Sequence, residues 1–170
     1  MKNRYPFIIS AAIISLASGS AHADYLKLYS PRVEKGELAA EVDLNYSKDH
    51  RADQDKYLSQ VVAAEYGVTD WWQTELGAEI EKDNGSNDQL TNLKFENVFV
   101  PWKPGENFVD TGFYLELEKA RHSGDPNNVE AKILLEKNIH NFVNTANIGA
   151  SHEFGNNASS GWSPSVALRT

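Results

Sequence analysis

The chain contains no cysteine, and this absence excludes disulfide bonds, thiolate zinc sites and cysteine nucleophiles. Basic residues are also few, because 16 Lys and Arg stand against 24 Asp and Glu and leave a formal charge of −8. A nucleic-acid-binding protein needs a basic surface that displaces counterions from phosphates. We therefore expect no nucleic-acid partner.

Long apolar runs are absent as well. Beyond the N-terminus, no run approaches the roughly 20 residues of a membrane-spanning helix. A membrane protein built from helices is therefore excluded. A membrane barrel built from strands is not, because its strands carry apolar residues only at alternate positions.

The first 23 residues have the features of a secretory signal peptide in the expected order. Lys2 and Arg4 form a positive start, residues 7–16 are mostly apolar, and small residues precede the expected cleavage site between Ala23 and Asp24. The alternative is a short buried N-terminal helix. We predict that residues 1–23 are a signal peptide and that residues 24–170 form one exported domain.

The remaining sequence alternates between apolar and polar residues with a period of two, which is typical of strands. The pattern is clearest in residues 37–47, 71–81 and 109–118. Weaker candidates follow the same rule: residues 57–66, 92–100, 129–137, 142–154 and 162–169. With no helical segment between these strands, the predicted fold is all-β: an antiparallel up-and-down transmembrane β-barrel with about eight strands present.

Strand length and connections favour a barrel in lipid over a soluble sheet. The predicted strands run to about 10–12 residues, longer than the roughly 5–6 of soluble proteins, and a tilt near 45° lets such strands span an apolar band of about 25 Å. Loose polar connections alternate with tighter or proline-containing ones. The loose ones are residues 48–55, 83–88, 121–128 and 155–161, and the others are residues 67–70, 101–107 and 138–141.

Aromatic residues gather at the ends of the predicted strands, where the interface between membrane and water would lie. One group flanks the tighter connections: Tyr66, Trp71, Trp72, Phe99, Trp102, Phe108 and Phe142. A second group flanks the loose connections: Tyr46, Tyr57, Phe154 and Trp162. Two aromatic belts of this kind are typical of outer-membrane barrels.

Residues 66–73, with the sequence Tyr-Gly-Val-Thr-Asp-Trp-Trp-Gln, resemble a periplasmic turn of Gram-negative outer-membrane β-barrels. The pattern is similar to the uncharacterised proteobacterial barrels that are described as porins or transporters. This resemblance implies residence in the cell outer membrane, with outer-membrane lipid and the barrel-assembly machinery as partners. Such barrels usually end in an aromatic residue, whereas residues 166–170 contain none. We expect a truncated part of a larger barrel; a different assembly signal, or no membrane barrel at all, are the alternatives.

In a membrane barrel, the charged face of each strand points into the lumen. The predicted lumen-lining residues are Glu41, Asp43, Glu75, Glu79, Glu81, Lys94, Asp110, Glu116, Glu118, Glu130, Lys132 and Glu136. An excess of carboxylates lowers the barrier for cations, so we expect a passive pore or transport component that favours them. Three alternatives remain: a polar interior that conducts nothing, a small closed eight-stranded structural or adhesion-type barrel, and a soluble periplasmic β-sandwich or lipocalin-like binding protein.

The sequence offers no catalytic residues. Glu79 with Glu81, and Glu116 with Glu118, have the residue types of a glycosidase pair, but their spacing shows no difference in environment. We interpret these residues as solvated lumen residues. No nucleophile, phosphate-binding or metal motif is present. We expect no enzyme activity, cofactor or metal, and the pattern identifies no substrate.

Overall fold

The computed structural model describes residues 8–9, 27–47, 56–82, 87 and 89–170. These residues form one sheet with no helix, and hence no helix that could cross a membrane. Its strands are β1 (Ile8–Ile9), β2 (Leu38–Ser47), β3 (Tyr57–Gly67), β4 (Trp72–Lys82), β5 (Gln89–Phe99), β6 (Asp110–Ala120), β7 (Asn127–Ile139), β8 (Phe142–Phe154) and β9 (Trp162–Arg169).

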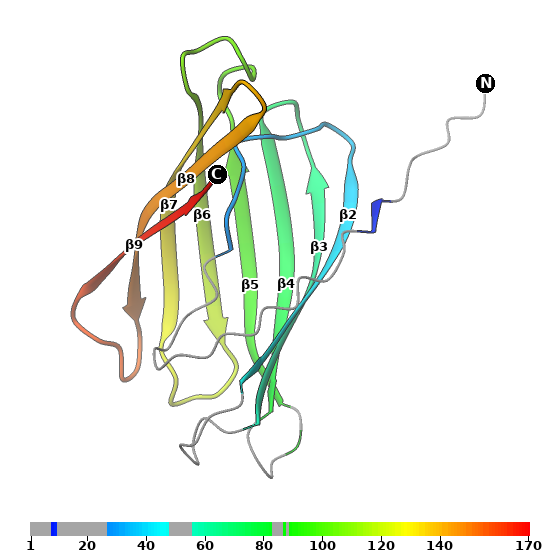
Figure 1. Ribbon diagram of the computed structural model, residues 1–170. Coiled ribbons are helices and arrows are strands. Elements are labelled where there is room, and N and C mark those ends of the chain that lie inside the picture. Colours follow the sequence, from blue (N-terminus) through cyan, green and yellow to red (C-terminus); the bar gives the residue numbers. More distant parts are fainter. Residues whose placement is uncertain (1–7, 10–26, 48–55, 83–86, 88) are drawn as a thin grey trace.

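The order of strands in the sheet follows the order in the chain (Figure 1). Each strand from β2 to β9 pairs antiparallel with the next, and the two-residue β1 pairs parallel with β2. The sheet curls into a half-barrel, and β2 and β9 do not pair with each other within the described ranges. The predicted all-β, up-and-down fold with eight long strands in an incomplete barrel is therefore confirmed.

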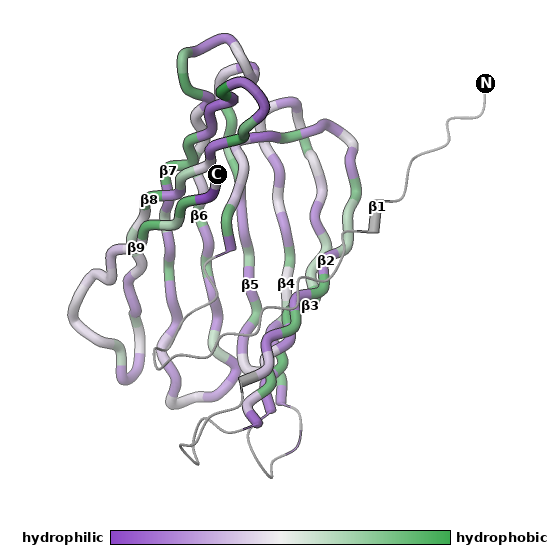
Figure 2. The backbone as a smooth tube through the Cα atoms, viewed as in Figure 1, coloured by the Kyte–Doolittle hydropathy of each residue, from purple (hydrophilic) through white to green (hydrophobic). Residues whose placement is uncertain are grey.

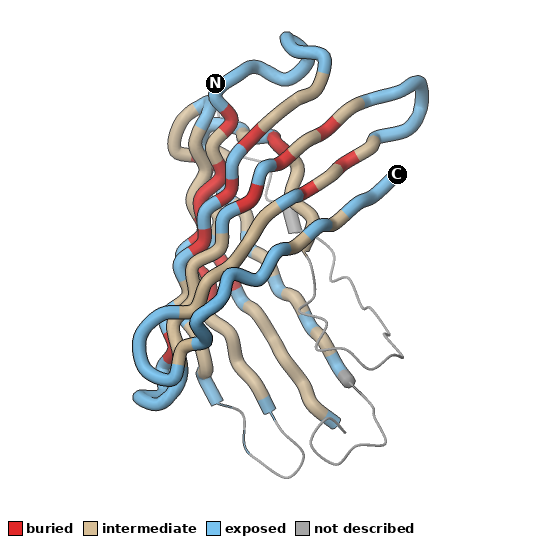
Figure 3. The backbone as a smooth tube through the Cα atoms, turned by 90° about the vertical axis from the view of Figure 1, so that its left-hand side faces the viewer, coloured by how far each residue is buried: buried red, intermediate tan, exposed pale blue. Residues whose placement is uncertain are grey.

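The two faces of the curled sheet differ in character. Along β6, Tyr114 and Glu116 are buried, whereas Leu115 between them is 46% exposed. The buried positions point into the curl and the exposed ones point away from it. Figure 2 shows the alternation of hydropathy along the strands, and Figure 3 shows buried positions alternating with exposed ones. The apolar side chains thus lie mainly on the convex face.

Residues 27–37, which we call the inner strap, run along the inside of the curl and then cross the end of the sheet, with residues 34–36 exposed, before the chain enters β2 (Figure 1). Pro31 of the strap is fully buried, and a Cβ atom at Gly112 of β6 would lie 3.0 Å from the Pro31 Cβ atom. Glycine at position 112 therefore leaves the space that the strap needs.

The apolar core of the sheet is small, because no second layer covers it. Its members are buried side chains of β5, β6 and β7 and of the residue after β5: Val98, Val100, Tyr114 and Leu134. Tyr29 and Val33 of the inner strap pack against this core. The strap thus takes the place of the layer that a sandwich would supply.

The connections lie at the two ends of the strands as predicted. Residues 100–109, between β5 and β6, form the longest connection that the structure describes in full, and this is the proline-containing connection predicted at residues 101–107. Gly105 has a φ of 83° there, and Pro101 and Pro104 cannot donate backbone hydrogen bonds. The predicted loose connections 48–55 and 83–88 lie outside the described residues, apart from Asn87.

Candidate functional site

A line of five carboxylates crosses the concave face at one level. Glu65 of β3 lies opposite Glu75 of β4 in the strand ladder, Glu75 opposite Glu96 of β5, Glu96 opposite Glu116 of β6, and Glu116 opposite Glu130 of β7. We call these residues the acidic row. Its three central members are 5–7% exposed. Like charges directly opposite each other destabilise a sheet, so the row requires compensating groups.

Three lysines supply part of this compensation. The Lys27 Nζ atom of the inner strap lies 2.7 Å from Glu41 Oε2 and 3.6 Å from Glu75 Oε1. Lys132 Nζ lies 2.7 Å from Glu130 Oε2. Lys94 forms longer ion pairs, with its Nζ atom 3.4 Å from Glu79 and 3.7 Å from Glu118. Carboxyl groups outnumber ammonium groups around the row.

The pKa of Lys27 reflects this excess. Burial alone would lower it, but the carboxylates of Glu96, Glu75 and Glu41 together raise the Lys27 pKa above its ordinary value. The strap therefore brings a permanent positive charge to the carboxylates of β2 and β4.

Two tyrosine hydroxyls link Glu96 and Glu116 at the centre of the acidic row. The Tyr29 hydroxyl of the strap donates a hydrogen bond to Glu96 Oε2 at 2.7 Å, and the Tyr114 hydroxyl donates one to Glu116 Oε2 at 2.9 Å. The two hydroxyl oxygens are 3.0 Å apart and the ring centroids 4.2 Å apart. Burial, and then the neighbouring Glu96 carboxylate, raise the Tyr29 pKa well above its ordinary value. Tyr29 therefore stays protonated and acts as a donor.

The inner strap is held in the curl by polar contacts with two later strands. Ser30 Oγ donates to Glu136 Oε2 at 2.6 Å, and Arg32 Nε donates to Glu136 Oε1 at 2.9 Å. The side chain of Asn147 bonds both backbone groups of Tyr29, accepting from its N–H at 2.7 Å and donating to its C=O at 2.8 Å. Glu136 and Asn147 are only 3% and 2% exposed, so these contacts fix the position of the strap.

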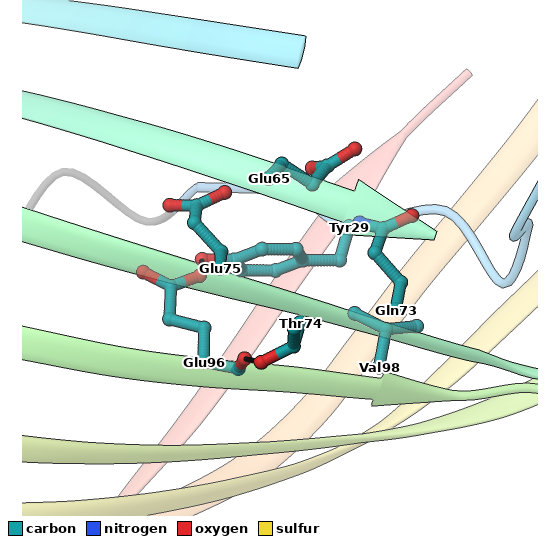
Figure 4. Close-up of a pocket in the computed structure, with 7 residues that line it drawn as sticks. All are labelled: Tyr29, Glu65, Gln73, Thr74, Glu75, Glu96 and Val98. Carbon is teal, nitrogen blue, oxygen red and sulfur yellow. Dashed lines mark hydrogen bonds between the residues drawn. The ribbon is translucent and has the colours of Figure 1, made fainter. Parts of the chain in front are cut away.

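A small cavity lies beside the row, with room for about one water molecule. Figure 4 shows its lining, in which the carboxylates of Glu65, Glu75 and Glu96 surround the Tyr29 ring. The remaining lining residues are Gln73, Thr74 and Val98. The ring occupies space between the carboxylates that solvent would otherwise fill.

All of the predicted lumen-lining residues lie on strands, and all of them are buried or half-buried. Three of them, Glu75, Glu116 and Glu130, are members of the acidic row. Sequence reasoning missed Glu65 and Glu96. Glu96 lies two residues after Lys94 and therefore on the same face of its strand, so the period of two could have predicted its place on the concave face. Glu65 lies in a segment with apolar residues on both faces, which hid its orientation.

The predicted interface aromatics lie at the ends of the strands or next to them. Most are exposed, and Trp71, Trp72 and Phe99 form a group with ring centroids 6.3–6.5 Å apart. Tyr57 differs from the others, because its hydroxyl donates to Glu81 on the concave face. The predicted cleavage site, Ala23 and Asp24, lies outside the described residues.

One group of carboxylates comes close enough to share an ion. Glu41, Glu65 and Glu75 each present an oxygen atom, and these atoms lie within 4.8 Å of one another. Sequence spacing could not reveal this group, because its members come from three strands. We found no other such group of His, Asp or Glu residues in the described part of the chain.

No family model matches the chain, and no curated protein or solved structure is similar enough to count as a match. The functional argument therefore depends on the geometry of the sheet and its concave face.

Proposed function

We propose that the protein is an outer-membrane β-barrel that acts as a passive pore or transport component with an acidic, cation-favouring lumen. One observation carries this proposal: the polarity of the sheet is inverted relative to a soluble protein. Carboxylates occupy the inside of the curl, while large apolar side chains such as Leu76 and Val166 are 64% and 59% exposed on the outside. Soluble monomers rarely expose a contiguous apolar face of this extent, whereas hydrocarbon solvates it.

The soluble alternative requires the opposite arrangement. A lipocalin-like module or a sandwich places its apolar residues in the core and its charges in water. Here Leu115 and Ile133 lie on the exposed convex face, while Glu116 and Glu136 are buried. The small closed barrel requires β2 to pair with β9, and the described residues show no such ladder.

The preference for cations follows from the charges on the concave face. Carboxylates of the acidic row lie next to one another on five strands, and the lysines near them are fewer. Rings of carboxylates favour the passage of cations and oppose that of anions. An entering cation would meet the charge that the lysines leave uncompensated.

Reversal potentials in planar bilayers under a salt gradient test the proposal. We expect the reversal potential to lie on the cation side, and Glu96→Gln combined with Glu116→Gln to move it toward zero. Asp125→Asn removes the same kind of charge from an exposed connection and serves as the control. Anion preference in the unaltered protein, or extraction from membranes without detergent, would contradict the proposal.

A further inference from the structure

Three carboxylates from neighbouring strands converge at one edge of the acidic row. Glu41 comes from β2, Glu65 from β3 and Glu75 from β4, and one oxygen of each lies within 4.8 Å of the other two. Oxygen ligands of calcium lie about 2.3–2.6 Å from the ion, so two of them can be at most about 5 Å apart. The spacing of the three oxygens is therefore within reach of one common ion.

A second observation points to a missing ligand in this group. The Glu75 side chain is 5% exposed, and its Oε1 atom is buried without a hydrogen-bond partner. The ammonium group of Lys27 lies 3.6 Å from this atom and donates its hydrogen bond to Glu41 instead, at 2.7 Å. A buried carboxyl oxygen without a hydrogen bond is costly. A cation between the three carboxylates would remove that cost.

We propose that Glu41, Glu65 and Glu75 form a divalent-cation site on the concave face, and that the ion it binds is calcium. The donor set consists only of carboxylate oxygens, which hard cations prefer over the softer transition metals. Calcium accepts irregular coordination by six to eight oxygens, whereas magnesium demands near-ideal octahedral geometry and gives up its water reluctantly. Ligands from three different strands are more compatible with the irregular coordination of calcium than with the octahedral coordination of magnesium.

Lys27 competes with calcium at this site. Its ammonium group provides one positive charge to Glu41 and lies near Glu75, where it would repel an entering divalent ion. Lys27 belongs to the inner strap, whose contacts with Glu136 and Asn147 hold the strap independently of this charge. Removing the ammonium group should therefore open the site while leaving the strap in place.

Calorimetric titration of the purified full chain with calcium, after treatment with a chelator, tests the proposal. We expect saturable binding of one ion. Glu75→Gln should weaken it by about tenfold or more, since one charged ligand is lost, and Lys27→Met should strengthen it severalfold. Asp125→Asn removes an equal charge from an exposed connection, where solvent and salt screen it, and it should change the affinity by less than about threefold.

Absence of saturable calcium binding would overturn the proposal, as would equal affinities for Glu75→Gln and the unaltered protein. If Glu75→Gln does not fold, Lys27→Met decides, and weaker binding by that variant would count against the site. The site lies in the interior that the proposed function assigns to cations, but binding does not require conduction. Calcium binding without cation-selective current would contradict the proposed function alone, and current without binding would contradict the site alone.

Discussion

The concave and convex faces of the sheet contain neighbouring residues of the same strands but differ in how their side chains are stabilised. On the convex face, Leu115 and Ile133 are exposed and alternate with buried residues. On the concave face, Glu96 and Glu136 depend on hydroxyl and guanidinium groups of the inner strap, far away in the sequence, whereas Glu116 accepts a hydrogen bond from Tyr114 of its own strand. The side chains of the convex face are therefore stabilised by the medium around the protein, whereas those of the concave face are stabilised mainly by contacts with residues distant in the sequence.

The sharpest test of this difference uses two adjacent residues of β7. Leu134 is fully buried beneath the inner strap, and Ile133 is 45% exposed on the convex face. Leu134→Ala should lower the free energy of unfolding by about 2–5 kcal/mol, because it leaves a cavity. Ile133→Ala should cost less than Leu134→Ala, because lipid chains fill the space that the lost side chain leaves and no cavity remains. Urea unfolding measures both, and equal losses would refute the distinction between the faces.

The surroundings of the convex face can be tested by the depth at which a charge is placed. Leu115 lies at the middle of β6, while Phe108 lies in the connection before it and is 83% exposed. In lipid, Leu115→Arg should cost about 2–4 kcal/mol and Phe108→Arg about 0–1 kcal/mol. Unfolding from lipid vesicles measures these values. Nearly neutral effects at both positions would show that the convex face meets water.

The contacts of the concave face can be tested at the strap. Arg32→Ala leaves the buried Glu136 carboxylate with Ser30 as its remaining strap donor, and we expect a loss of about 1–2 kcal/mol. Arg32 is itself half exposed, which limits the effect. Adding Glu136→Gln should recover part of the loss, because the unpaired charge is removed. Additive losses in the double variant would show that the two residues do not interact.

The smallest effect concerns high pH. The pKa of Tyr29 is raised above its ordinary value of 10.0 by burial and by Glu96, so the folded protein holds this proton more tightly than the unfolded chain does. Its contribution to stability is complete below pH 10 and is lost as the pH rises above that value. Absorbance near 295 nm follows tyrosine ionisation, and Tyr29→Phe should lower by one the number of tyrosines that resist ionisation at about pH 11. An unchanged titration curve in this variant would contradict the assignment.

Most of the sheet could be predicted from the sequence, because a period of two is a local signal. The predicted limits of 142–154 and 162–169 coincide with β8 and β9, and the other predicted strands end within three residues of the observed limits. Glu65 escaped prediction because apolar residues lie on both faces of β3. The inner strap has no repeating pattern, and its contacts lie far along the chain, so no local signal revealed it.

The inner strap also constrains the order in which the protein folds. Tyr29 bonds Asn147 across 118 positions of sequence, so the strap cannot dock until β8 is in place. Closing so long a loop is entropically expensive, and contacts of high sequence separation form slowly. The earliest residues of the described domain are therefore among the last to reach their final position. Until then, the carboxylates of the curl lack the hydroxyl, guanidinium and ammonium groups that the strap delivers.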